Sequence, residues 1–224
     1  MNLYNNKVTY RVNHLLRNIV IKKKRNQLQN KDFTILCNNC NAGILLHDLK
    51  LRFDTPTINM FFHGTDFFDF IEHIDYYINI NLTEKNPTYH GELNYPIGIL
   101  KGEVKYKDLE LHFLHYRSFE EAYEKWETRK KRIHWDNLFL MWTFFGSMSE
   151  QGNEIFYKRV QNLPIKNKVI FVNHPVDKYT YPNFFYIKGF ENQEGLGVLS
   201  QFMNLKGEYF LDQFNYVDWL NKNK

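Results

Sequence analysis

The sequence predicts an α/β protein with a single domain, in which a mostly parallel sheet carries helices on both faces as a three-layer fold. Short apolar runs alternate with amphipathic stretches along most of the 224 residues, an order typical of parallel strands joined by helical crossovers. The chain shows no internal repeat and no low-complexity linker, and its length suits one large core. We expect residues 1–30 to form an N-terminal basic amphipathic helix and residues 31–224 to form the α/β domain.

The first predicted helix, residues 10–28, has one apolar face and one basic face. Leu15 and Ile19 belong to the apolar face, and the run Lys22-Lys-Lys-Arg25 follows near the end. Such a helix can pack on the body of the domain or lie on a membrane surface. A peripheral contact with the inner face of the membrane through this helix is therefore one expectation.

The remaining elements follow from apolar periodicity. Strands are predicted where short apolar runs are bounded by turn residues, and helices where apolar positions recur every three or four residues. Ser118 and Glu121 form a Ser-x-x-Glu capping box at the start of the clearest helix. The polar stretch 79–95 is predicted to be a long loop. The predicted strands are residues 33–36, 57–62, 97–100, 109–114, 138–143, 169–172 and 184–187, and the further helices are residues 42–52, 66–78, 150–161 and 211–221.

Composition and charge exclude several classes of protein. The formal charge of +4 is mild and does not indicate a nucleic-acid partner, which requires a concentrated basic stripe. The sequence contains no secretory signal and no run of about 20 apolar residues, the length needed to cross a bilayer. We therefore expect a cytoplasmic protein, in which the two cysteines form no structural disulfide.

The junction at Cys37-Asn-Asn-Cys40 is the main candidate site. It follows a predicted strand and precedes a predicted helix, and ligands of open α/β sheets bind at the carboxyl ends of strands. A cysteine at a helix N-terminus favours the thiolate, which can attack an acyl carbonyl. The amides of Asn38 and Asn39 can line an oxyanion or sugar site. A small buried residue is the alternative for Cys40.

A histidine is predicted to lie at the same edge of the sheet as Cys40, the rim formed by the carboxyl ends of the strands. His115 lies where a predicted strand gives way to the capped helix, and its imidazole can serve as general base, or can tie the loop structurally. His47 and Asp48 can contact substrate or orient a catalytic group. Arg117 can bind phosphate, as can the arginines of the run Arg129-Lys-Lys-Arg132, which is otherwise typical of a solvated helix end. The cysteine pair lacks a fourth ligand for zinc, so no metal is expected.

Several segments together resemble one family. They are Cys37-Asn-Asn-Cys-Asn-Ala-Gly43, Leu46-His-Asp-Leu49, Tyr95-Pro-Ile-Gly98, His115-Tyr-Arg-Ser-Phe-Glu-Glu-Ala122 and Phe214-Asn-Tyr-Val-Asp-Trp-Leu-Asn221. They resemble the domain of unknown function numbered nineteen-nineteen, over nearly the whole chain. That family is associated with exopolysaccharide biosynthesis, which implies a role near bacterial surface glycans. It usually has serine at the position of Cys37, which argues against a redox pair.

The leading hypothesis is a transferase of exopolysaccharide biosynthesis that moves an acyl group, such as acetyl, to a sugar precursor. Cys40 is the expected nucleophile or site-lining residue, His115 the general base, and a coenzyme A thioester the candidate donor. The expected partner is a sugar or polysaccharide precursor. Three alternatives stay open: a glycosyltransferase, a non-catalytic binding or scaffolding protein of the glycan-assembly machinery, and a thiol redox protein that uses Cys37 and Cys40.

Overall fold

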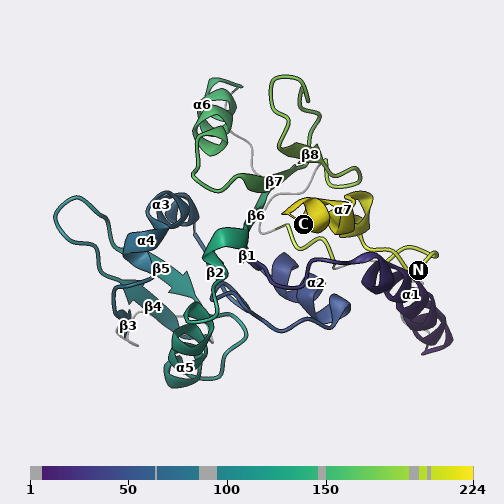
Figure 1. The fold of residues 1–224 in the computed structure, drawn as a ribbon, viewed down its shortest axis with the longest axis horizontal. Helices are drawn as coiled ribbons and strands as arrows, with labels where there is room; N and C mark the ends of the chain where they lie inside the picture. Colours follow the sequence, from purple (N-terminus) through teal and green to yellow (C-terminus); the bar gives the residue numbers. More distant parts are fainter. Residues whose placement is uncertain are drawn as a thin grey trace.

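A computed structural model describes residues 7–63, 65–85, 95–145, 150–191, 197–200 and 203–223. A parallel sheet of four strands, in the order β1-β6-β7-β8, forms the middle of the fold (Figure 1). The predicted fold class, a single α/β domain built on a parallel sheet, is confirmed. The strands of this sheet are β1 (Thr34–Cys37), β6 (Leu138–Phe144), β7 (Asn167–Val172) and β8 (Phe184–Tyr186).

The strands of the parallel sheet direct alternate side chains into two separate hydrophobic clusters. Along β6, Leu140 and Trp142 belong to one cluster, whereas Phe139 and Met141 belong to the other. Because successive side chains of a strand point to opposite faces, the sheet lies between two apolar layers. Burial on both faces also explains why these strands are continuous apolar runs in the sequence.

Helices supply the two outer layers. The face that carries Phe139 packs against α2 and α7, and the face that carries Trp142 packs against α3 to α6 (Figure 1). This arrangement is the predicted three-layer fold. The helices are α2 (Asn41–Leu49), α3 (Asp66–Glu72), α4 (Ile74–Tyr77), α5 (Phe119–Lys130), α6 (Glu150–Gln161) and α7 (Tyr216–Leu220).

A second sheet, which the sequence did not predict, lies beside α3 and α5 (Figure 1). It is antiparallel, with the order β2-β5-β4-β3. Only residues 101–108 connect β4 to β5, too few for a helical crossover of about a dozen residues. Within the predicted loop 79–95, three residues form β3, and residues 86–94 lie outside the described residues. The strands are β2 (Phe61–Phe62), β3 (Leu82–Glu84), β4 (Ile97–Leu100) and β5 (Leu109–His112).

Three predicted helices have informative boundaries. The predicted helix 66–78 is divided at His73, whose backbone leaves the helical region with φ −126° and ψ 39°. The N-cap half of the predicted capping box is confirmed, because the hydroxyl of Ser118 accepts the backbone N–H of Glu121 at 3.3 Å, whereas the carboxylate of Glu121 accepts the N–H of Arg117 instead of that of Ser118. The predicted helix 211–221 is divided between α7 and the short 3-10 turns η4 (Phe210–Gln213) and η5 (Asn221–Asn223), whereas the 3-10 turn η3 (Trp135–Asn137) directly precedes β6.

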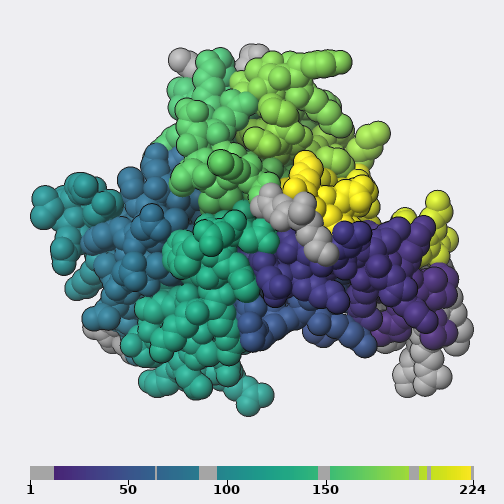
Figure 2. Space-filling model, in the orientation of Figure 1, coloured from purple at the N-terminus to yellow at the C-terminus, as the bar shows by residue number. Residues whose placement is uncertain are grey.

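The N-terminal helix α1 (Lys7–Gln27) packs on the body of the domain. Its buried Arg17 forms ion pairs with Asp48 of α2 and Asp212 of η4, and Lys24 also pairs with Asp212, at 2.5 Å. Figure 2 shows the purple helix lying against the C-terminal segment in yellow. In the part of the chain that the structure describes, no helix is both long and apolar enough to cross a membrane.

Candidate functional site

The polar turn after β1 is held to the end of β6 by an amide. The side chain of Asn38 donates to the carbonyl of Thr143 at 2.9 Å and accepts the N–H of Thr143 at 3.0 Å. The side-chain N–H and oxygen of Asn38 therefore replace the backbone hydrogen bonds that would continue the pairing of β1 with β6 beyond the end of β1. The predicted role of Asn38 in lining a substrate site stays a prediction, and its amide already serves the fold.

The next two amides of the turn are buried. The side-chain oxygen of Asn39 accepts the N–H of Asn41 at 3.0 Å and the thiol of Cys37 at 3.3 Å. Asn41 is completely buried and joins the start of α2 to β6 and to the segment 197–199. Buried amides must be hydrogen-bonded, and these bonds fix the turn that presents Cys40.

Cys40 occupies the N-cap position of α2, with a half-buried side chain. Burial raises the pKa of its thiol above the ordinary value, which opposes the expected stabilisation of a thiolate by the helix. The second cysteine, Cys37, is completely buried, and burial raises its pKa to about 12. Both cysteines are free thiols. A buried, protonated Cys37 is poorly suited to the redox alternative.

The outer edge of β1 is covered by residues 54–59, much of which had been predicted to be a strand. The hydroxyl of Thr34 donates to the carbonyl of Asp54 at 2.7 Å, and the N–H of Cys37 donates to the hydroxyl of Thr57 at 3.0 Å. These bonds cover an edge that would otherwise expose unpaired backbone groups. They also bring residues 57–59 to the carboxyl end of β1, beside the polar turn.

His115 is attached to this same segment. Its backbone N–H donates to the carbonyl of Asn59 at 3.4 Å, and the side-chain oxygen of Asn59 faces Gly43 in the first turn of α2. The imidazole of His115 is exposed and forms no hydrogen bond with any residue that the structure describes. His115 and the first turn of α2, which begins at Cys40, therefore both adjoin residues 58–59, whereas direct contact between imidazole and thiol stays a prediction.

A buried tyrosine–arginine pair lies next to this rim. The hydroxyl of Tyr116 donates to the carbonyl of Ile58 at 3.0 Å and accepts a guanidinium N–H of Arg129 at 2.6 Å. Burial raises the pKa of Tyr116, and a negative charge on Cys40 would raise it further, so the two groups lie within electrostatic range. Sequence reasoning had assigned Arg129 to a solvated helix end, but it is buried.

The other predicted substrate contacts lie at separate places. His47 is 82% exposed at its side chain, and Asp48 is engaged by Arg17. Both are six or more residues after the start of α2, about 9 Å along the helix axis, away from the turn at Cys40. Arg117 is exposed, and its backbone N–H donates to the carboxylate of Glu121 at 3.3 Å.

Sequence reasoning missed a histidine at the carboxyl end of β7. Nε2 of His174 lies 2.5 Å from the hydroxyl of Tyr157, and Nδ1 lies 3.3 Å from the side-chain oxygen of Asn173. Burial raises the pKa of Tyr157 to about 12 and lowers the pKa of His174. Tyr157 therefore donates to a neutral imidazole. The polar Asn-His pair directly after the apolar run of β7 was the signal that could have revealed it.

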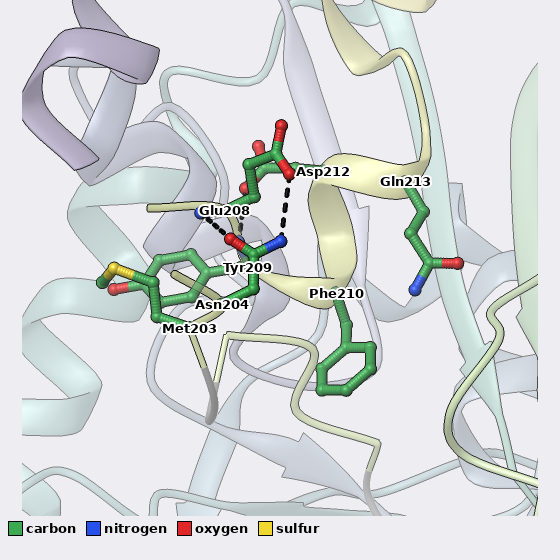
Figure 3. Close-up of a pocket in the computed structure, with 7 residues that line it drawn as sticks. All are labelled: Met203, Asn204, Glu208, Tyr209, Phe210, Asp212 and Gln213. Carbon is green, nitrogen blue, oxygen red and sulfur yellow. Dashed lines mark hydrogen bonds between the residues drawn. The ribbon is translucent and has the colours of Figure 1, made fainter. Parts of the chain in front are cut away.

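Three hollows of the surface lie away from the turn at Cys40. The largest, about 810 Å³, is lined by Leu138 and Asn167 at the amino ends of β6 and β7, together with the exposed Trp135. A second, about 130 Å³, lies beside β7 and β8. The third, about 260 Å³, adjoins η4, where Asn204 binds Glu208 near the buried Asp212 (Figure 3). Within the described ranges, no three His, Cys, Asp or Glu residues are grouped so that they could hold a metal ion.

The fold and its polar rim define a single-domain α/β protein with titratable side chains at the carboxyl end of a parallel sheet. The chain belongs to the family described as Domain of unknown function (DUF1919), whose model matches residues 11–221. It is also 37% identical, over 218 residues, to an uncharacterised protein of Haemophilus influenzae. That match covers 96% of this chain and 97% of the relative.

Proposed function

We propose that the protein is a transferase that moves an acyl group from a coenzyme A thioester to a hydroxyl of a sugar precursor. The observation that supports it most is the exposed imidazole of His115, which forms no hydrogen bond with the described residues and whose backbone N–H is attached to the segment beside the first turn of α2. An imidazole is an effective general base near neutral pH. The resemblance to a family associated with exopolysaccharide biosynthesis supports a surface-polysaccharide precursor as acceptor, and such donors and precursors favour a cytoplasmic site of action.

The proposed step is direct transfer. Nε2 or Nδ1 of His115 takes the proton of the acceptor hydroxyl while that oxygen attacks the thioester carbonyl. The carbon–sulfur bond then breaks, and the departing thiolate of coenzyme A takes the proton from the imidazolium. Cys40 lines the site as a neutral thiol, since burial raises its pKa.

His115→Gln is expected to reduce acyl transfer about a hundredfold, because it removes the general base. The assay measures the release of free coenzyme A thiol from acyl donors in the presence of sugar precursors. Cys40→Ser is expected to retain most of the activity, and His14→Gln, an exposed histidine of α1, serves as the control. Wild-type activity in His115→Gln would exclude this mechanism.

We also propose a peripheral contact between α1 and an anionic membrane. Leu15 and Ile19 lie one turn apart and are 65% and 67% exposed, and the exposed Lys22 and Lys23 follow on the same helix. Apolar side chains beside lysines suit the interface of an anionic bilayer. Because Arg17 fixes α1 to the body, point variants test this contact better than removal of the helix.

The double variant Leu15→Ser/Ile19→Ser is expected to bind anionic vesicles about tenfold more weakly than the wild type, because two inserted side chains are lost. Co-sedimentation with vesicles that contain phosphatidylglycerol measures this, and binding of the wild type should fall as salt is added. Ile155→Ser changes a similarly exposed residue on α6 and controls for surface hydrophobicity. Equal sedimentation of both variants would contradict the proposed contact.

A further inference from the structure

Arg129 is a buried cation with no carboxylate partner among the described residues. It lies in the last turn of α5 and is only 9% exposed. Its guanidinium donates to the hydroxyl of Tyr116 at 2.6 Å and lies 5.5 Å from the ring centre of Phe53. These are the only hydrogen bond and cation–ring contact of its side chain in the described ranges, and both partners are uncharged.

Two other buried cations among the described residues, Arg17 and Lys168, show which partners Arg129 lacks. Arg17, buried to a similar extent, is paired with the carboxylates of Asp48 and Asp212. Lys168 donates to three backbone carbonyls, and burial lowers its pKa. The guanidinium of an arginine stays protonated inside a protein, so a buried guanidinium is best satisfied by an anion. The dipole of α5 favours a cation in its last turn, but it does not replace a counter-ion.

We propose that Arg129 and Tyr116 form the binding site for a phosphate group of the substrate. A guanidinium presents several donors in a planar fork that matches phosphate oxygens. Tyr116 holds one of these donors and is itself anchored to the carbonyl of Ile58, so the fork is pre-oriented. This site does not depend on the proposed acyl transfer, since nucleotide sugars, lipid-linked sugars and coenzyme A all carry phosphate.

A phosphate bound by Arg129 and Tyr116 would lie beside the rim that carries His115 and Cys40. Tyr116 directly follows His115, and Cys40 lies within electrostatic range of its hydroxyl. Glu121 of α5 contributes a negative charge that acts on Tyr116, but its carboxylate accepts the backbone N–H of Arg117 and forms no ion pair with Arg129. A phosphate at Arg129 would therefore hold a substrate close to the candidate catalytic groups.

The test compares melting temperatures with inorganic phosphate at constant ionic strength. Phosphate at ten times its dissociation constant is expected to raise the Tm of the wild type by about 3–5 °C. Arg129→Met is expected to abolish this rise. Without phosphate, the Tm of Arg129→Met is expected to equal or exceed that of the wild type, because an unpaired buried charge has been removed. Arg132→Met, three residues further along the same run, is the matched control and should retain the rise.

Two further variants keep the test decisive if Arg129→Met does not fold. Tyr116→Phe removes only the hydroxyl that positions the guanidinium and should weaken phosphate binding severalfold, and Arg129→Lys should retain the charge but lose the fork.

Coenzyme A and a nucleotide sugar, added separately, distinguish the sources of the phosphate. The site is overturned if phosphate raises the Tm of the wild type and Arg129→Met equally, or does not raise it at all. Phosphate binding should persist in His115→Gln, so failure of the transfer mechanism would be seen separately.

Discussion

Replacement of Asp212 by asparagine is expected to lower the free energy of unfolding by about 3–4 kcal/mol, because it breaks a buried ion-pair network. The carboxylate is 3% exposed and pairs with Arg17 and Lys24. It also accepts the hydroxyl of Tyr216 at 3.1 Å and the N–H of Tyr209 at 2.7 Å. The uncharged side chain of asparagine cannot neutralise the charges of Arg17 and Lys24. Urea unfolding at pH 7 measures the change.

The pH dependence of this loss follows from the pKa of Asp212. Burial raises that pKa, but Arg17 and Lys24 lower it more, so that it lies below the ordinary value. A carboxyl group with a lower pKa in the folded state contributes its full stability above its unfolded pKa, about 3.9. The contribution is lost as pH falls through the folded pKa. The difference between wild type and Asp212→Asn should therefore be constant near neutrality and should shrink below about pH 4.

Asp218→Asn is the matched control for Asp212→Asn. Asp218 lies in the first turn of α7, is exposed, and accepts a hydrogen bond from the side chain of Asn215. The same change there is expected to cost less than about 1 kcal/mol. If both variants lost equal stability, the network around Asp212 would not be what fixes α1 to the body.

The parallel sheet could be predicted because its strands are buried on both faces, so that a run such as β6 is apolar except for Thr143. The second sheet could not be predicted in the same way. β2 has only two residues, Phe61 and Phe62, which pair with His112 and Leu111 of β5. That partnership joins segments far apart in the chain, and hydrophobic periodicity carries no information about it.

The burial of Arg129, by contrast, could have been read from the sequence. Ala122, Trp126 and Arg129 lie on one face of a helix, at spacings of four and three residues, and all three are buried. The basic run from Arg129 to Arg132 obscured this periodicity. Burial of the amide at Asn41 could not have been foreseen, since its partners Thr143 and Leu199 lie more than a hundred residues further along the chain.

Asn41→Ala is expected to cost about 2–4 kcal/mol of unfolding free energy, because it leaves several buried groups without partners. The amide of Asn41 donates to the hydroxyl of Thr143 and to the carbonyl of Gly197, each at 2.9 Å. Its oxygen accepts the N–H of Leu199 at 2.8 Å. The methyl group of alanine replaces none of these bonds. Urea unfolding, at the same pH as the wild type, measures the loss.

Asn204→Ala provides a control with the same change and the same number of hydrogen bonds at an exposed position. The oxygen of Asn204 accepts the N–H groups of Lys206 at 2.8 Å and Glu208 at 3.0 Å, and its amide donates to the carboxylate of Glu208 at 3.0 Å. Water replaces these bonds when they are lost, so the cost should stay below about 1 kcal/mol.

Because Asn41 follows Cys40 directly, Asn41→Ala should also speed the reaction of that half-buried thiol with a thiol reagent. Equal costs in the two variants, with unchanged reactivity of Cys40, would mean that the buried amide does not fix the turn.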